Sequence, residues 1–89
     1  MKMRNEDLKK ITEVKMYLLD PPVSFKLYDY AFIYLQDAIK VLAAYPKAKD
    51  VIDYLQGIIT RLKNKEIEQG ELRSILKEAG IEISRLSNK

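Results

Sequence analysis

The sequence predicts an all-α fold, a small bundle of about four helices, and two observations carry this prediction. Apolar residues recur every three or four positions along most of the chain, which is the period of an amphipathic helix. Pro21, Pro22 and Pro46 divide these periodic stretches into segments of helical length. We therefore expect helices at 5–19, 24–44, 47–64 and 68–79, with room for a short helical turn after the last.

Length and composition limit the size and the chemistry of the protein. A chain of 89 residues is expected to form a single helical domain, 1–89, and 47% hydrophobic residues suffice for its core. The chain has no cysteine and no histidine. Their absence removes the thiolate nucleophile, the commonest metal ligand and the usual acid–base group near neutral pH. We predict that the protein is not an enzyme, with no catalytic residues, no cofactor and no metal.

The first and third expected helices are ordinary amphipathic helices with one apolar stripe each. The first ends before Pro21 and Pro22, because proline has no amide donor and disfavours helical geometry in the residue before it. The third follows Pro46, which suits the first turn of a helix. Their stripes are Leu8, Ile11, Val14 and Leu18 in the first, and Val51, Ile52, Leu55, Ile58, Ile59 and Leu62 in the third.

The second expected helix, 24–44, is more apolar than a helix of a small bundle needs to be. Its polar residues Asp29, Gln36 and Lys40 form one narrow side, with Asp37 beside it. Either neighbouring helices of the same chain surround it or a second subunit does, and we favour a twofold homodimer. The tyrosines of this helix are suited equally to a protein interface and to the edge of the monomer's own core. The candidate interface residues are Tyr30, Phe32, Ile33, Tyr34 and Val41.

A basic flank of the third helix is the basis of an alternative function. Lys47, Tyr54 and Arg61 follow one another at intervals of seven, which places cations and an aromatic ring along one side of the helix. The candidate nucleic-acid contacts are Lys47, Tyr54, Arg61, Lys63 and Lys65. The same pattern is typical of the solvated side of a lysine-rich helix, and a net charge of +3 is small for a nucleic-acid-binding protein.

The fourth expected helix ends at Gly80. A glycine suits the left-handed position that follows a helix, and Ile81 would then contact Leu76. Residues 75–81, followed by Leu86, also resemble the first half of a helix-turn-helix motif, in which a glycine in the turn lets two helices pack. The helix-ending glycine explains the same residues, and we favour it.

The chain is expected to be cytoplasmic. Charged residues interrupt both the N-terminal region and the apolar segment 25–45, which argues against a secretion signal and against a membrane partner. The use of Ile, Lys and Glu resembles that of thermophile proteins. We predict a non-enzymatic helical protein-interaction or oligomerisation module, a homodimer acting as an accessory subunit. It binds itself and, as a further partner, another protein. A small nucleic-acid-binding regulator is the alternative.

Overall fold

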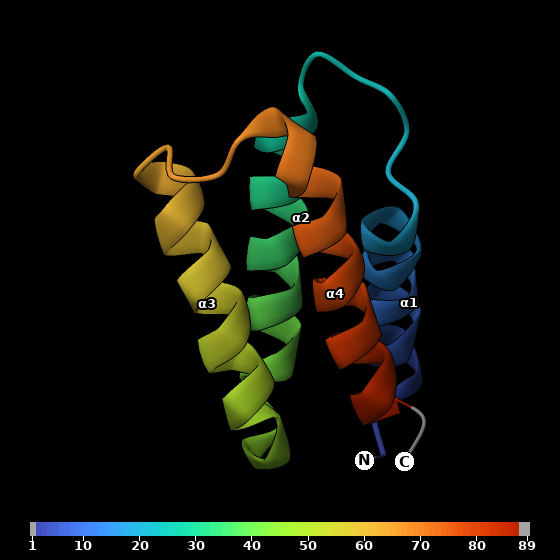
Figure 1. Cartoon of the computed structure of the whole chain (residues 1–89). Coiled ribbons are helices and arrows are strands. Elements are labelled where there is room, and N and C mark those ends of the chain that lie inside the picture. Colours follow the sequence, from blue (N-terminus) through green and yellow to red (C-terminus); the bar gives the residue numbers. More distant parts are fainter. Residues whose placement is uncertain (1, 88–89) are drawn as a thin grey trace.

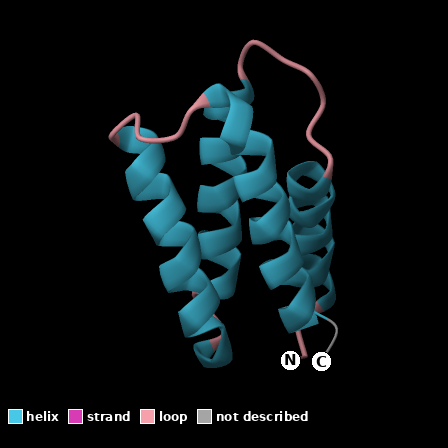
Figure 2. Cartoon of the chain, in the orientation of Figure 1, coloured by secondary structure: helices cyan, strands magenta, loops and turns pink. Residues whose placement is uncertain are grey.

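The computed structural model describes residues 2–87 and confirms the all-α bundle (Figures 1 and 2). Its elements are α1 (Asn5–Leu19), α2 (Leu27–Leu42), the 3-10 helix η1 (Pro46–Ala48), α3 (Lys49–Lys63) and α4 (Gln69–Ser87). Successive helices run in opposite directions, so the α1–α2 and α3–α4 loops lie at the same end of the molecule (Figure 1). We call this end the loop end. The bundle measures 35 × 22 × 17 Å along its principal axes.

The four helices surround one apolar core. α1 packs on α4 and on α2, and α2 lies between α1 and α3, whereas α3 and α4 share the sparsest helix–helix contact of these pairs. The two predicted stripes supply Ile11, Val14, Leu18, Leu55, Ile58 and Ile59 to the core, whereas Leu8 of the first stripe is 39% exposed. Fully buried core residues are Ile11, Val14, Leu18, Ala31, Leu35, Ala38, Leu42, Ala48, Leu55, Leu72, Leu76, Ala79 and Ile83.

The prolines act as predicted. α1 ends at Leu19, just before the Pro21–Pro22 pair, and Pro46 begins the single turn η1 that leads into α3. α2 is shorter than the expected 24–44. Its start is delayed because residues 24–26 form a separate turn, in which the Lys26 amide donates to Ser24 Oγ over 3.1 Å.

The turn between α3 and α4 is fixed by a left-handed residue, Lys65, with φ 56°. The Lys65 amide donates to the Leu62 carbonyl over 3.1 Å, and the Glu66 amide donates to the Arg61 carbonyl over 2.9 Å. These two bonds form a Schellman motif, in which the residue after the helix takes the left-handed conformation. A lysine therefore occupies a position where glycine is the usual residue.

The predicted end of the fourth helix at residue 79 is wrong. α4 continues through Gly80 to Ser87, and the backbone of Gly80 is helical. The reason lies in the packing on α1: a Cβ atom at Gly80 would lie 2.9 Å from Leu19 Cδ2 and 3.3 Å from Leu18 Cβ. Gly80 thus allows close approach of two helices and ends neither of them. The turn that a helix-turn-helix motif needs here is also lacking in the described chain.

Candidate interaction surface

The flanks of α2 are partly covered by its neighbours in the same chain. Tyr34 stacks on Tyr17 of α1, with ring centroids 4.1 Å apart and planes 16° apart. On the other flank, the Lys63 ammonium of α3 lies 5.7 Å from the centroid of the Phe32 ring, within cation–π range. Val41 is also half-buried against the core. Three of the five candidate interface residues therefore have intramolecular contacts.

The outward side of α2 carries the other two candidates. Asp29, Gln36 and Lys40 are exposed, as the narrow polar side predicts. Ile33, which helical geometry places among them, is 51% exposed, and Tyr30 is 42% exposed. The exposed candidate interface residues of α2 therefore lie in its first two turns.

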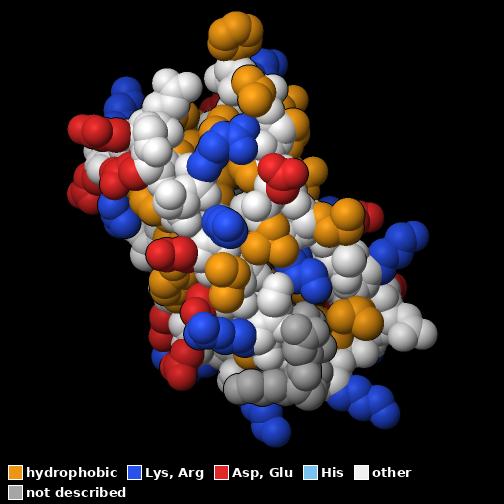
Figure 3. Space-filling model, turned by 45° about the vertical axis from the view of Figure 1, so that its right-hand side comes forward, with side chains coloured by type: hydrophobic (Ala, Val, Ile, Leu, Met, Phe, Trp, Pro, Cys, Tyr) orange, Lys and Arg blue, Asp and Glu red, His pale blue; other side chains and the backbone are white. Residues whose placement is uncertain are grey.

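The α1–α2 loop adds two apolar side chains that the sequence interpretation did not nominate. Val23 is 95% exposed and Phe25 is 109% exposed relative to an extended reference. Pro21, at the base of the loop, is buried. Figure 3 shows hydrophobic side chains projecting at the loop end, with basic side chains beside them. A signal was present in the sequence, because two large apolar residues stand in a proline-rich connection where turn residues are expected.

A pocket of about 430 Å³ opens at the same loop end. Tyr28, Asp29, Leu62, Lys65 and Ile67 line it. The Tyr28 hydroxyl donates to the Ile67 carbonyl over 2.9 Å, which ties the start of α2 to the α3–α4 loop. The pocket combines an aromatic ring and two aliphatic side chains with one acid and one base.

The basic flank predicted for helix three is divided between two sides of α3. Lys63 lies against Phe32 of α2, whereas Tyr54 faces α4 in a groove of about 330 Å³ whose other lining residues are Glu78, Ile81, Glu82 and Arg85. Burial raises the pKa of Tyr54 above its ordinary value, and the carboxylates of Glu78 and Glu82 act in the same direction. Arg61 shares the Tyr54 side by helical spacing. The ring is therefore bordered by acidic side chains as well as by cations.

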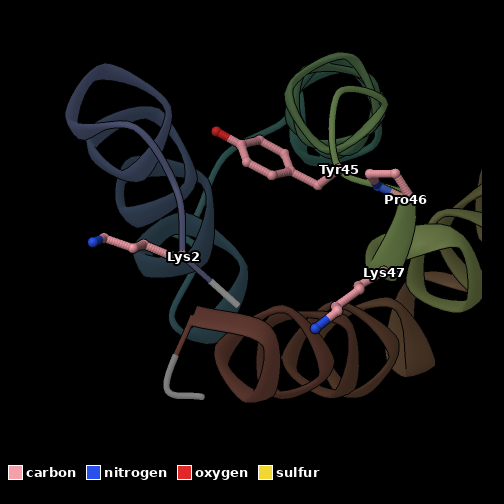
Figure 4. A pocket seen from close by; sticks show the side chains of 4 residues that line it. All are labelled: Lys2, Tyr45, Pro46 and Lys47. Atoms are coloured by element: carbon pink, nitrogen blue, oxygen red, sulfur yellow. The ribbon is translucent and has the colours of Figure 1, made fainter.

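The last two basic candidates occupy opposite ends of the molecule. Lys65 lines the pocket at the loop end, and Lys47 lies in η1 at the other end. There, Lys47 borders a hollow of about 330 Å³ with Lys2, Tyr45 and Pro46. Figure 4 shows the two lysine side chains pointing in different directions while the Tyr45 ring points toward α1. Lys47 and Lys65 therefore lie at opposite ends of the molecule and cannot contact one ligand together, and Lys2 and Lys47 point in different directions.

Tyr45 instead joins two parts of the chain. Its hydroxyl accepts a hydrogen bond from the Arg4 amide over 3.1 Å and donates one to Asp7 Oδ2. The hydrogen bond from the Tyr45 hydroxyl holds the pKa of Asp7 below its ordinary value. The Arg4 guanidinium, 3.1 Å from Asp7 Oδ2, also lowers this pKa, whereas partial burial of the carboxylate raises it. We call Arg4, Asp7 and Tyr45 the N-terminal clasp.

Among residues 2–87, no three acidic side chains gather closely enough to hold a metal ion. Within the same residues, no helix has both the length and the apolar character needed to cross a membrane. Comparison with known proteins finds no matching family model, no matching curated protein and no matching solved structure.

Proposed function

We propose that this chain is a non-enzymatic protein-interaction module that forms a homodimer through its loop end and the first two turns of α2. The observation that carries the proposal is the exposure of five large apolar or aromatic side chains within residues 23–33, namely Val23, Phe25, Tyr28, Tyr30 and Ile33. Complete burial of one such large apolar side chain contributes about 1.5–3 kcal/mol. Covering several of these side chains would therefore contribute favourably to the free energy of binding a partner.

The charges around these apolar side chains support a second copy as the partner. The start of α2, beside these apolar side chains, carries one base, Lys26, and one acid, Asp29. Although the whole chain has a net charge of +3, this region is balanced, so two copies of it do not repel each other strongly. The role proposed for such a dimer is that of an accessory subunit.

Nucleic-acid binding by the flank of α3 has less support. The aromatic ring that would stack on bases, Tyr54, lies beside Glu78 and Glu82, whose charges repel phosphates. Lys63, one of the proposed cations, lies on the α2 side of the helix. The cations that remain are spread over both ends of the molecule.

Sedimentation velocity from low to high micromolar concentration tests the proposal. We expect the full chain to sediment as a dimer toward the upper part of this range. The double variant Phe25→Ser/Ile33→Glu removes two exposed apolar side chains, leaves the core intact and should be monomeric at every concentration. The matched control is Met16→Ser/Ser74→Glu, because Met16 is 66% exposed on α1 and Ser74 is exposed on α4. This control should dimerise like the original chain.

Two results would contradict the proposal. The first is a monomer over the whole concentration range. The second is a dimer that both double variants weaken equally, because the contact would then not depend on the loop end. Circular dichroism of all three proteins checks that the helices are retained.

A further inference from the structure

A projecting aromatic side chain and a pocket lie together at the loop end. Phe25 is as exposed as in an extended chain, so its ring is not packed on its own protein. The turn that presents it is held by the hydrogen bond from the Lys26 amide to Ser24 Oγ and by the buried Pro21. Proline fixes its own backbone φ. These restraints on the backbone of the loop reduce the conformational entropy that is lost on binding, whereas the exposed ring itself becomes ordered only when it binds.

The pocket is suited to an aromatic ring. Its volume of about 430 Å³ falls within the range of about 300–1,000 Å³ that is typical of sites for small apolar groups. Leu62 and Ile67 give it aliphatic walls and Tyr28 gives it an aromatic one. The wall formed by the α3–α4 loop is set by the Schellman bonds at Lys65 and Glu66. The pocket is therefore formed before any ring enters it.

We propose that Phe25 of each copy inserts into this pocket of the other copy, across a twofold axis at the loop end. The inference rests on the proposed homodimer and specifies its central contact. Because the projection and the pocket lie at the same end, a twofold arrangement can make the exchange reciprocal and close it after two copies. A projection and a pocket at opposite ends would instead propagate into a filament.

Charge around the contact favours the same pairing. Lys26 follows Phe25 directly in the loop, and Asp29 lies on the lining of the pocket. The pocket is also lined by Lys65, so the favourable register is the one that places Lys26 on the Asp29 side of the other copy's pocket. Opposite charges at the rim of an interface increase the rate of association and select the register.

The full chain with Phe25→Trp tests the inference directly. The sequence contains no tryptophan, so the substituted ring is the sole indole fluorophore. We expect its emission maximum to move to shorter wavelength as the concentration rises from low to high micromolar, in parallel with dimer formation by sedimentation. Met16→Trp is the matched control, because this side chain is exposed on α1. Its emission should stay at long wavelength throughout.

The other outcomes are distinguishable. Short-wavelength emission that does not depend on concentration would place the ring in the pocket of its own chain and overturn the inference. A dimer whose tryptophan emits at long wavelength would also overturn it, while leaving the proposed homodimer standing. A monomer at every concentration would overturn both.

A mixing experiment followed by NMR detects the same contact through the side chains that line the pocket. The methyl groups of leucine and isoleucine are isotopically labelled in a Phe25→Ala variant, which is then mixed with the unlabelled original chain. We expect ring-current shifts at Leu62 and Ile67, because the only Phe25 ring available belongs to the other copy, and none at the exposed Ile81. Mixing with unlabelled Phe25→Ala should give no shift. Equal spectra in the two mixtures would contradict the insertion.

Discussion

Tyr17 carries a buried polar group without a partner. In the part of the chain that the structure describes, its hydroxyl oxygen is buried and makes no hydrogen bond, and burial raises its pKa above the ordinary value. Because Phe keeps the ring that stacks on Tyr34, we expect Tyr17→Phe to raise the free energy of unfolding by about 1 kcal/mol. Urea denaturation at neutral pH measures the change.

The control for this prediction is a tyrosine whose hydroxyl is used. Tyr28 donates to the Ile67 carbonyl, so Tyr28→Phe should lower the free energy of unfolding by about 0.5–1.5 kcal/mol. The two substitutions remove the same atom and should have opposite signs. A loss of stability in Tyr17→Phe would mean that its hydroxyl has a partner.

At single residues, the sequence predicted which side of a helix a residue lies on better than it predicted which side chains of other helices cover that residue. Helical periodicity correctly placed Asp29, Gln36 and Lys40 on the exposed side of α2. It did not predict that Tyr17 and Lys63 reach over the flanking aromatic rings, because periodicity on one helix carries no information about side chains on its neighbours. The exposed Phe25 was missed because the second helix was predicted to begin at residue 24, whereas α2 begins at Leu27 and Phe25 lies in the connection before it.

At the scale of one helix, two glycines offer a matched comparison. Gly57 in α3 and Gly80 in α4 both lie inside helices, where alanine is favoured over glycine by about 1 kcal/mol. Among the described residues, no atom apart from its chain neighbours and its own helix backbone lies within 4 Å of a Cβ built at Gly57, whereas one at Gly80 would meet Leu18 and Leu19. We expect Gly57→Ala to stabilise by about 0.5–1 kcal/mol. Gly80→Ala should be at least about 1 kcal/mol less favourable than that, because the Leu19 side chain must rotate away and Leu18 Cβ, at 3.3 Å, must also give way.

Thermal and urea unfolding of both variants measure this difference. Equal stabilisation by the two alanines would show that the contact at Gly80 relaxes without cost, through rotation of the partly exposed Leu19 side chain. The same contact explains why the predicted end of the fourth helix was wrong. Local preference assigns an isolated glycine to a helix end, and only the neighbouring helix shows that the missing side chain is needed for packing.

For the whole molecule, proline breaks and helical periodicity were enough to predict a small all-α bundle. They did not predict that α1 packs most extensively on α4, which is its neighbour in space and the most distant helix in sequence. Nor did they predict the link between the start of α1 and the α2–η1 connection. That link is the N-terminal clasp, which depends on Tyr45 reaching Asp7 from a distant part of the chain.

The clasp predicts how stability depends on pH. The pKa of Asp7 is lower in the folded chain than in the unfolded chain, where it is about 3.9. The unfolded state therefore binds the proton at a higher pH. The stabilisation is fully present above about pH 5 and is lost as the pH falls through the folded pKa of Asp7. We expect Tyr45→Phe to lower the free energy of unfolding at neutral pH and to lose less further stability than the original chain in acid.

Urea unfolding at neutral pH and at about pH 3 separates the two contributions of Tyr45. The bond accepted from the Arg4 amide does not titrate, so its loss lowers stability equally at both pH values. The bond donated to Asp7 contributes only while the carboxylate is ionised, so the deficit of Tyr45→Phe should shrink in acid. Tyr28→Phe is the control, because its hydroxyl donates to a backbone carbonyl and its deficit should not change with pH. A Tyr45→Phe deficit that stays constant would show that the clasp does not hold Asp7 in its ionised form.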